Sequence, residues 1–318
     1  MSNCRHVLFV LSLLAVLTGC ACHNSERTAS VEHFPFVNAP AVMSDEQKLD
    51  YLAEHFWDSF FKKAKGCADT DSTTLGPVPR IEVEQAVANY IALLLSQPLA
   101  KAQSNAASFA EALIGLEQAD TSGTVFEQLS DLFEKYMFDP NSPVRDEDIY
   151  AGYAGEMASF LDLPVAKRAS YLEDARLSSL NVRGSKAADF SFCDRSGRSY
   201  TLYGITAERT ILFFSNPGCT ACKEIIETIK TVPGLDNAIS SGRIAVLNIY
   251  IDEDIAAWLD YMPIYPESWY NGYDYDHMIR GNELYNVRAI PSLYLLDENK
   301  TVLLKDVPVE RLINNLTI

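Results

Sequence analysis

Two cysteines, Cys219 and Cys222, are separated by two residues and are the part of the sequence best suited to chemistry. The residues before them, 210–214, form a short apolar run that predicts a buried strand, and Asn216-Pro217-Gly218 interrupts it. The residues after them, 223–232, carry isoleucines at helical spacing. The cysteine pair is therefore predicted at a strand-to-helix junction, in the first turn of a helix.

This position favours disulfide exchange. Residues three apart on a helix have Cα atoms about 5–6 Å apart, which is within the range that a disulfide tolerates. The free amide groups and the positive end of the helix dipole stabilise a thiolate at the first cysteine, so Cys219 is predicted to be the attacking sulfur. Cys222, one turn further on, would attack the mixed disulfide and release the product. The spacing thus predicts a redox-active disulfide between Cys219 and Cys222.

Three other uses of the pair fit the sequence less well. A zinc site needs about four ligands, but the sequence has no second Cys-x-x-Cys and His277 is alone in its neighbourhood. A structural disulfide that closes so short a loop would constrain the unfolded chain little. Peroxide-reducing enzymes place a Thr three residues before the reactive cysteine, where this chain has Asn216. The redox pair is favoured, and no metal or cofactor is predicted.

The segments 213–222 and 289–297 together resemble the thioredoxin-like fold. They are most similar to envelope-anchored thiol-disulfide oxidoreductases of the type used in cytochrome c maturation and to their lipoprotein relatives. The resemblance covers about 187–318 and implies an α/β domain with a central mixed sheet flanked by helices. It also implies catalytic roles for Cys219, Cys222 and the cis-proline Pro291, and binding of a substrate strand by the backbone of Ile290.

The chain departs from the family pattern at three places. Thioredoxins usually have Trp before the first cysteine, where this chain has Gly218, and their Gly-Pro dipeptide is here Thr220-Ala221. Because the dipeptide tunes the reduction potential, the sequence leaves reductant and oxidant roles open. Envelope relatives often have a proton-transferring Glu where this chain has Ile225, so that role is not carried over.

The rest of the second half, 181–318, alternates between strand and helix patterns. A hairpin is predicted over 189–202 and a buried strand over 243–251, followed by helices near 253–262 and 276–285. The connection 261–276 is rich in aromatic and acidic residues. It is interpreted as the packing of an inserted loop in preference to a substrate groove.

The first half, 41–180, is predicted to be an all-helical domain. Its apolar residues recur at helical spacing, with Ser44 and Gln47 as a capping box. It contains 24 acidic and 11 basic residues between positions 31 and 180, which are interpreted as solvated faces, and the acids of 146–148 suit the first turn of a helix. The domain resembles an uncharacterised domain that precedes thioredoxin-like domains in some bacterial lipoproteins, a match without known activity. The six expected helices cover 44–66, 81–96, 99–119, 124–138, 146–162 and 164–179.

The N-terminus has the layout of a secretory signal. An apolar run at 7–17 is too short to span a bilayer, and it ends in Leu-Thr-Gly before Cys20. This resembles a bacterial lipoprotein signal, which implies removal of residues 1–19, lipidation of Cys20 and a flexible tether over 20–40. The alternative is an ordinary cleaved signal with a chance cysteine. Either way, the expected location is the bacterial cell envelope, with the protein facing the periplasm.

Cys22, Cys67 and Cys193 have neither a predicted redox role nor a predicted lipid. Cys67 and Cys193 could form a structural bridge or be free thiols, and Cys22 lies in the tether.

Composition limits the partners. The net charge of −17 would repel a phosphate backbone, so nucleic acid is excluded as a partner. The expected partners are protein thiols or disulfides, an upstream redox protein and the membrane that holds the lipid anchor. The rival interpretation is a non-catalytic scaffold lipoprotein, in which the helical domain docks a partner and the cysteine pair is idle.

Overall fold

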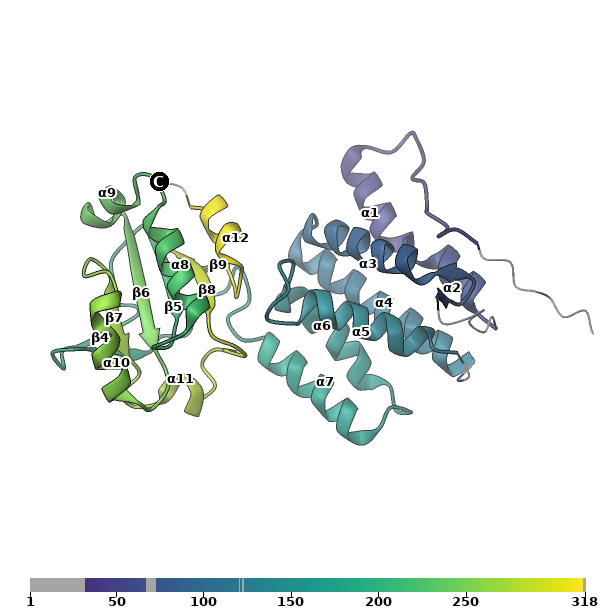
Figure 1. Ribbon diagram of the computed structural model, residues 1–318. Coiled ribbons are helices and arrows are strands. Elements are labelled where there is room, and N and C mark those ends of the chain that lie inside the picture. The colour runs from purple at the N-terminus through teal and green to yellow at the C-terminus, as the bar shows by residue number, and fades with distance from the viewer. Residues whose placement is uncertain (1–31, 67–72, 120, 122, 317–318) are drawn as a thin grey trace, which may run out of the picture.

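A computed structural model describes residues 32–66, 73–119, 121 and 123–316. The chain forms a helical domain followed by a domain built on a mixed sheet, and the two lie side by side (Figure 1). The signal segment and most of the tether, with Cys20 and Cys22, lie outside the described residues, as does Cys67. In the part of the chain that is described, no helix is both long and apolar enough to cross a membrane.

The helical domain follows the predicted pattern closely. Ser44 caps the first helix with the expected box, in which the backbone of each partner donates to the side chain of the other. Buried aromatic and aliphatic side chains fill one continuous core between the helices. A two-residue hairpin, β1 (Thr74–Leu75) with β2 (Val78–Pro79), precedes α3. The helices are α1 (Asp45–His55), α2 (Asp58–Ala64), α3 (Arg80–Leu95), α4 (Leu99–Ala119), α5 (Val125–Met137), α6 (Glu147–Ser159) and α7 (Val165–Ser178).

The first predicted helix is in fact two. The backbone turns at Phe56 and Trp57, so that α1 ends and α2 begins. Both rings are buried, and both pack against Phe34 from the segment before α1. Burial of these two neighbouring rings accompanies the break in what the periodicity predicts as a single helix.

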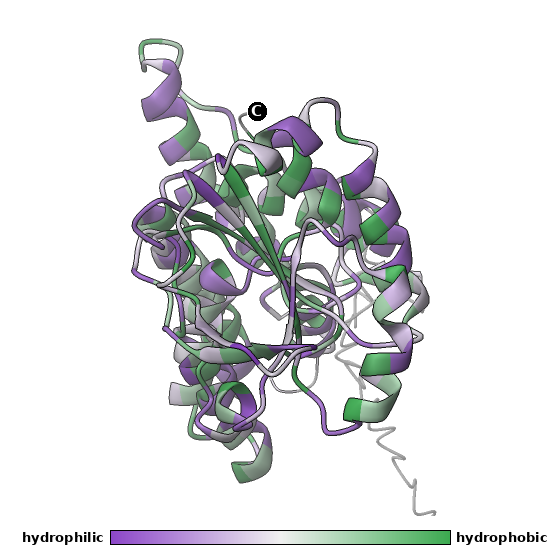
Figure 2. Ribbon diagram, turned by 90° about the vertical axis from the view of Figure 1, so that its left-hand side faces the viewer, coloured by the Kyte–Doolittle hydropathy of each residue, from purple (hydrophilic) through white to green (hydrophobic). Residues whose placement is uncertain are grey.

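The second domain contains a seven-stranded sheet in the order β4-β3-β7-β6-β5-β8-β9. The central strands β5 and β6 are parallel, β6 and β7 are parallel, and β8 runs antiparallel to β5. Figure 2 shows hydrophobic strands running through the middle of this domain. The strands are β3 (Ser191–Asp194), β4 (Ser199–Thr201), β5 (Arg209–Phe214), β6 (Ile244–Tyr250), β7 (Tyr270–Tyr273), β8 (Ser292–Asp297) and β9 (Val302–Leu304).

Helices cover both faces of the sheet. One core joins alternate strand residues to α8 (Thr220–Lys230), α9 (Leu235–Ser240), α10 (Ile255–Tyr261) and α12 (Val309–Asn314). The other core joins the opposite strand residues to the segment before β5 and to α11 (Met278–Gly281). This is the mixed sheet flanked by helices that the resemblance implies, so the fold class is confirmed.

The aromatic connection after α10 contains a strand that the sequence pattern does not reveal. A short 3-10 helix, η1 (Met262–Ile264), is followed by β7, which pairs with both β6 and β3. Tyr265 and Trp269 are buried in the sheet's core, so the packing interpretation holds for them. A Cβ atom at Gly272 would overlap the ring of Phe192, which explains the glycine in the middle of this strand.

Candidate redox site

The two cysteines lie where the strand and helix patterns meet. Strand β5 ends at Phe214, and α8 begins at Thr220 with Cys219 as its N-cap residue. Cys219 and Cys222 form a disulfide with Cα atoms 5.2 Å apart. The disulfide therefore lies between the end of β5 and the first turn of α8, as the sequence predicts.

The two sulfurs have different environments. Cys219 is partly exposed, whereas Cys222 is buried in the core between α8 and the sheet. The backbone N–H of Cys222 donates to Sγ of Cys219 over 3.1 Å. The free amides of a helix's first turn stabilise negative charge. The geometry thus presents the first sulfur to a partner and shields the second.

Gly218 has a structural reason for standing where thioredoxins have Trp. Its φ angle is +71°, in the left-handed region that favours glycine. No atom lies within 4 Å of the place where a Cβ would be, so the backbone angle and not crowding favours glycine there.

The loop that carries Ile290 and Pro291 reaches the same end of the sheet. Ser292, the first residue of β8, pairs with Phe214, the last residue of β5. The Ile290–Pro291 peptide bond is cis, as the resemblance implies. Ile290 is half-buried against the same core as Cys219 and Cys222. The structure therefore gathers at one end of the sheet the four residues that the sequence predicts for the redox site.

A carboxylate that the sequence reasoning missed is tied to the cysteine loop. Asn216, three residues before Cys219, donates through Nδ2 to Oδ2 of Asp252 over 2.5 Å. Arg280 pairs with the other oxygen of Asp252 at 2.8 Å. Asp252 lies two residues after β6, whose carboxyl end lies beside that of β5. In the sequence, Asp252 directly follows the predicted strand 243–251, and this position was the signal that could have placed it at the end of a strand.

The remaining cysteine that the structure describes is Cys193 of β3. It is a buried free thiol, so of the alternatives left by the sequence it takes the free form. Burial, with Asp194 and Asp276 nearby, raises the pKa of this thiol. Within the described residues no group of His, Cys, Asp and Glu side chains could hold a metal ion.

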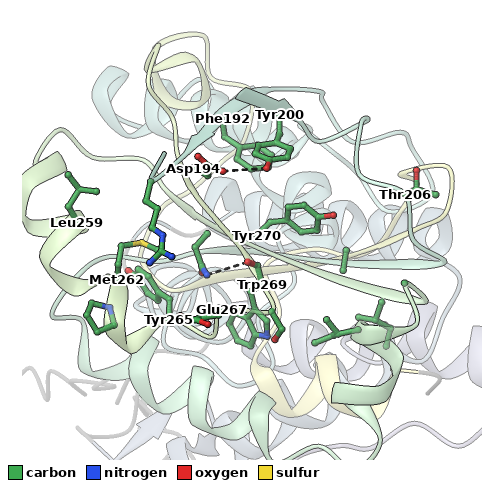
Figure 3. A pocket seen from close by; sticks show the side chains of 18 residues that line it. Phe192, Asp194, Tyr200, Thr206, Leu259, Met262, Tyr265, Glu267, Trp269 and Tyr270 are labelled. Atoms are coloured by element: carbon green, nitrogen blue, oxygen red, sulfur yellow. Dashed lines mark hydrogen bonds between the residues drawn. The ribbon is translucent and has the colours of Figure 1, made fainter. Parts of the chain in front are cut away.

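A pocket lies at the other end of the sheet. It has a volume of about 830 Å³ and is lined by the starts of β6 and β7 and by the aromatic connection (Figure 3). Ile244 and Ala245, which line it, pair with the first residues of β5, whereas the cysteines follow the last. The pocket is therefore separate from the disulfide.

Comparison with known proteins agrees with this architecture. A thioredoxin-like protein from Bacteroides caccae is 33% identical, with a TM-score of 0.75 over 90% of this chain and 98% of that one. The C-terminal domain of an uncharacterised Bacteroides fragilis protein is 43% identical over 43% of this chain and 97% of its own, with a TM-score of 0.41. A domain of a possible thiol-disulfide isomerase from Cytophaga hutchinsonii is 26% identical over 43% of this chain and 91% of its own, with a TM-score of 0.37.

The chain belongs to the thioredoxin-like proteins, on the full-length likeness to the Bacteroides caccae structure. Residues 20–161 match a family described as a domain of unknown function, DUF5106, which covers most of the helical domain. The chain matches none of the curated proteins with which it was compared.

Proposed function

We propose that this protein is a thiol-disulfide oxidoreductase of the bacterial cell envelope that exchanges disulfides with other proteins. The observation that carries the proposal is the asymmetric pair at the start of α8, with Cys219 partly exposed and Cys222 buried in one disulfide. An exposed attacking sulfur beside a shielded resolving sulfur is what a two-step exchange requires.

The proposed exchange has two steps, and each step forms one S–S bond, breaks another and releases one thiolate. In the reduced protein, the thiolate of Cys219 attacks one sulfur of a substrate disulfide, and the other substrate sulfur leaves as a thiolate. Cys222 loses its proton and attacks Sγ of Cys219, which releases the first substrate sulfur as a second thiolate. The protein ends with the Cys219–Cys222 disulfide, and a dithiol partner runs the same steps in reverse to reduce it again.

The loop before β8 is proposed to hold the substrate. Ile290 is half-buried at the end of the sheet that carries the disulfide. Its backbone would pair with an extended substrate segment while Cys219 attacks. Pro291 would then shape the loop so that the substrate sulfur faces Cys219.

The proposed location follows from the N-terminal sequence. Lipidation of Cys20 after removal of residues 1–19 would anchor the protein to a membrane. The tether would be shorter than the predicted 20–40, because the ring of Phe34 is buried in the core of the helical domain. A compartment outside the cytoplasm allows disulfides to persist, which suits this chemistry. The proposed partners are protein thiols and disulfides in the envelope and an upstream protein that restores the redox state.

The test is to trap the intermediate. Cys222→Ala leaves Cys219 able to attack but unable to be released, so mixed disulfides should accumulate in cells and disappear on reduction. Cys219→Ala is the matched control and should trap none, and Cys193→Ala in the Cys222→Ala background should change nothing. If Cys222→Ala captures no more protein than Cys219→Ala, the scaffold interpretation replaces the enzyme.

A further inference from the structure

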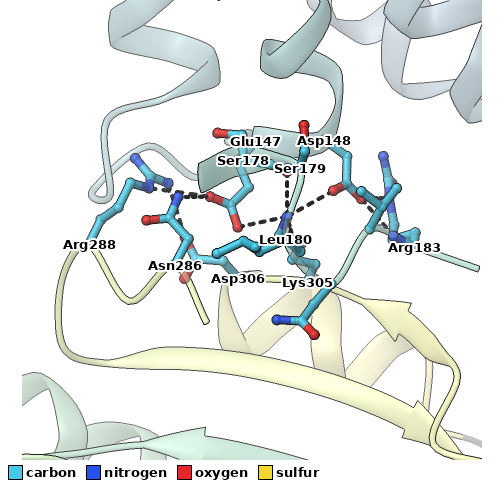
Figure 4. Close-up of polar contacts among 12 residues, drawn as sticks. Glu147, Asp148, Ser178, Ser179, Leu180, Arg183, Asn286, Arg288, Lys305 and Asp306 are labelled. Carbon is cyan, nitrogen blue, oxygen red and sulfur yellow. Dashed lines mark hydrogen bonds and ion pairs between the residues drawn. The ribbon is translucent and has the colours of Figure 1, made fainter. Parts of the chain in front are cut away.

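The two domains meet through a cluster of buried charges, which we call the interdomain cluster (Figure 4). Its acids stand mainly at the start of α6, where Asp146 is the N-cap residue. Its cations come mainly from the linker and from the second domain. The members are Asp146, Glu147, Asp148, Asp306, Arg145, Arg183, Arg288, Lys305 and Arg311. Each member has an oppositely charged partner within the cluster, as buried charges require.

Lys305 of the second domain makes hydrogen bonds and ion pairs to the helical domain. It follows β9, yet its side chain is only 1% exposed and lies among residues of the helical domain. Its Nζ donates to Oδ1 of Asp148 over 3.1 Å and to the carbonyls of Ser178 and Leu180, over 2.7 and 2.5 Å, at the end of α7. One ammonium thus joins the start of α6 to the end of α7, where helix dipoles favour a cation at the carbonyl end.

Arg288 connects the interdomain cluster to the proposed substrate loop. It lies three residues before Pro291, and its Nη1 donates to the carbonyl of Phe138 in the helical domain. Its guanidinium carbon stands 4.1 Å from the centre of the Phe138 ring, and its Nε lies 3.5 Å from Oε2 of Glu147. Asn286, two residues earlier, donates to the same oxygen over 2.7 Å. The N-terminal end of the loop is therefore held by the helical domain.

The far side of the loop is held as well. Ser292, which directly follows Pro291, donates through Oγ to Oδ1 of Asp306 over 2.8 Å. The second oxygen of Asp306 accepts from Arg288 over 3.1 Å and from Arg145 of the helical domain over 3.3 Å. All four side chains are largely buried. Asp306 therefore links both ends of the loop to each other and to the helical domain.

We infer that one part of the interdomain cluster, Arg145 and Arg288 with their partners Asp306 and Glu147, positions the loop 288–292 for the substrate, so that the helical domain is a working part of the redox site. This rests on the proposed function. Arg288, Asp306 and Arg145 are positioning residues, because they act through the loop and touch neither sulfur. Because both ends of the loop are held by hydrogen bonds and ion pairs, its backbone is already ordered before a substrate strand binds. Binding therefore does not have to offset the entropy cost of ordering the loop.

The test compares Arg288→Gln and Arg145→Gln with the full-length wild type. Arg183→Gln is the matched control, since Arg183 belongs to the same cluster but pairs with Asp146 and Asp148 and not with Asp306 or Glu147. The first readout is hydrogen exchange of the backbone amides of Ala289 and Ile290, which needs no activity. The second readout compares two rates of disulfide reduction. One is the reduction of insulin, a protein disulfide, and the other is the reduction of a small aromatic disulfide, which does not need the loop.

Both test variants should exchange the loop amides about tenfold faster than wild type. They should lose about tenfold in kcat/KM for the protein disulfide, mainly through KM, while turnover of the small disulfide stays within about twofold. Arg288→Lys, which keeps the charge but not the planar fork, should recover part of the loss. Arg183→Gln should match wild type in both readouts.

Two outcomes would overturn the inference. If wild type is active and the test variants match it in loop exchange and in substrate preference, the positioning role is wrong while the proposed function stands. If wild type exchanges disulfides with neither substrate, the proposed function fails and the positioning role fails with it.

Discussion

Cys219 and Cys222 lie in the first turn of α8 but differ in exposure, and the proposed order of attack depends on this difference. Cys219 accepts a hydrogen bond from the helix's first turn and faces outward. Cys222 is buried among isoleucines of the sheet's core. A reagent should therefore distinguish the two sulfurs once the disulfide is reduced.

We expect the reduced protein to be alkylated first at Cys219. The reaction should have its midpoint below about pH 8.5, the value for a free cysteine, because the helix start stabilises the thiolate. Iodoacetamide labelling against pH, read by peptide mass, checks this, with the buried Cys193 as the internal slow reference. Preferential labelling of Cys222, or an unshifted midpoint at Cys219, would contradict the proposed order of attack.

Replacement of Pro291 should impair turnover more than folding. Pro291 lies in the loop and not in a strand, so Pro291→Ala removes no core side chain. It should lower the free energy of unfolding by no more than about 1 kcal/mol. Insulin reduction should fall by about tenfold or more. Full activity in Pro291→Ala would remove the loop from the mechanism.

The residues of the site were not equally visible in the sequence. Cys219, Cys222 and Pro291 stand in a local pattern, so spacing and resemblance could identify them. Asp252 and Lys305 could not be identified in this way, because their contacts join segments distant in the chain. The acids of 146–148 show the same limit. The sequence predicts a helix start, and Asp146 does cap α6, but Glu147 and Asp148 are buried in the interdomain cluster and not solvated.

At the scale of elements, periodic segments were predictable and irregular ones were not. The helices from α3 to α7 begin and end within a few residues of the predicted ranges, and α3 to α6 each bury an apolar stripe. Strand β7 has four residues, Tyr-Asn-Gly-Tyr, and lacks the alternation that marks a strand. Its pairing depends on the neighbours β6 and β3, and this information is not local.

Two glycines of α6 offer a matched test of helix packing. A Cβ at Gly152 would overlap the carbonyl oxygen of Gln103 in α4 and lie 3.0 Å from the carbonyl carbon, whereas nothing lies within 4 Å of a Cβ at Gly155. Gly152→Ala should therefore lower the free energy of unfolding by about 1–3 kcal/mol. Gly155→Ala should leave it unchanged or raise it by up to about 1 kcal/mol.

Urea unfolding of both variants measures these changes. The close approach of α4 and α6 is wrong if Gly152→Ala is as stable as Gly155→Ala.

At the scale of the whole molecule, the interdomain cluster makes the stability of the protein depend on pH. Burial raises the pKa of Glu147 to about 7, while Lys305 and Arg288 partly offset this. The charge of Asp306 raises the pKa of Glu147 further. Asn286 donates a hydrogen bond to the Glu147 carboxyl group, and Asp148 pairs with Lys305 beside it. Because the folded pKa lies above the value of 4.5 for an unperturbed Glu, the native state binds more protons between these values. Stability should fall as the pH rises through this window.

The prediction compares wild type with Glu147→Gln. Between about pH 5 and 8 the free energy of unfolding of wild type should fall more steeply with pH than that of the variant, with a difference of up to about 3 kcal/mol across the window. Urea unfolding at several pH values measures both slopes.

Glu84→Gln is the control for this comparison. The hydrogen bond from Lys135 holds the pKa of Glu84 below its usual value, so its titration lies under the window and its removal should leave the slope unchanged. Equal slopes for wild type and Glu147→Gln would show that Glu147 stays charged throughout the window.

The reduction potential of the Cys219–Cys222 disulfide decides whether the two cysteines form a redox-active pair. The full chain is equilibrated in dithiol and disulfide buffers of known potential, quenched by alkylation and read by mass, with Cys193→Ala to remove the other described thiol. We predict a potential between about −270 and −120 mV, the span of thioredoxin-like redox proteins. A potential below about −300 mV, which is typical of structural disulfides, would contradict the account.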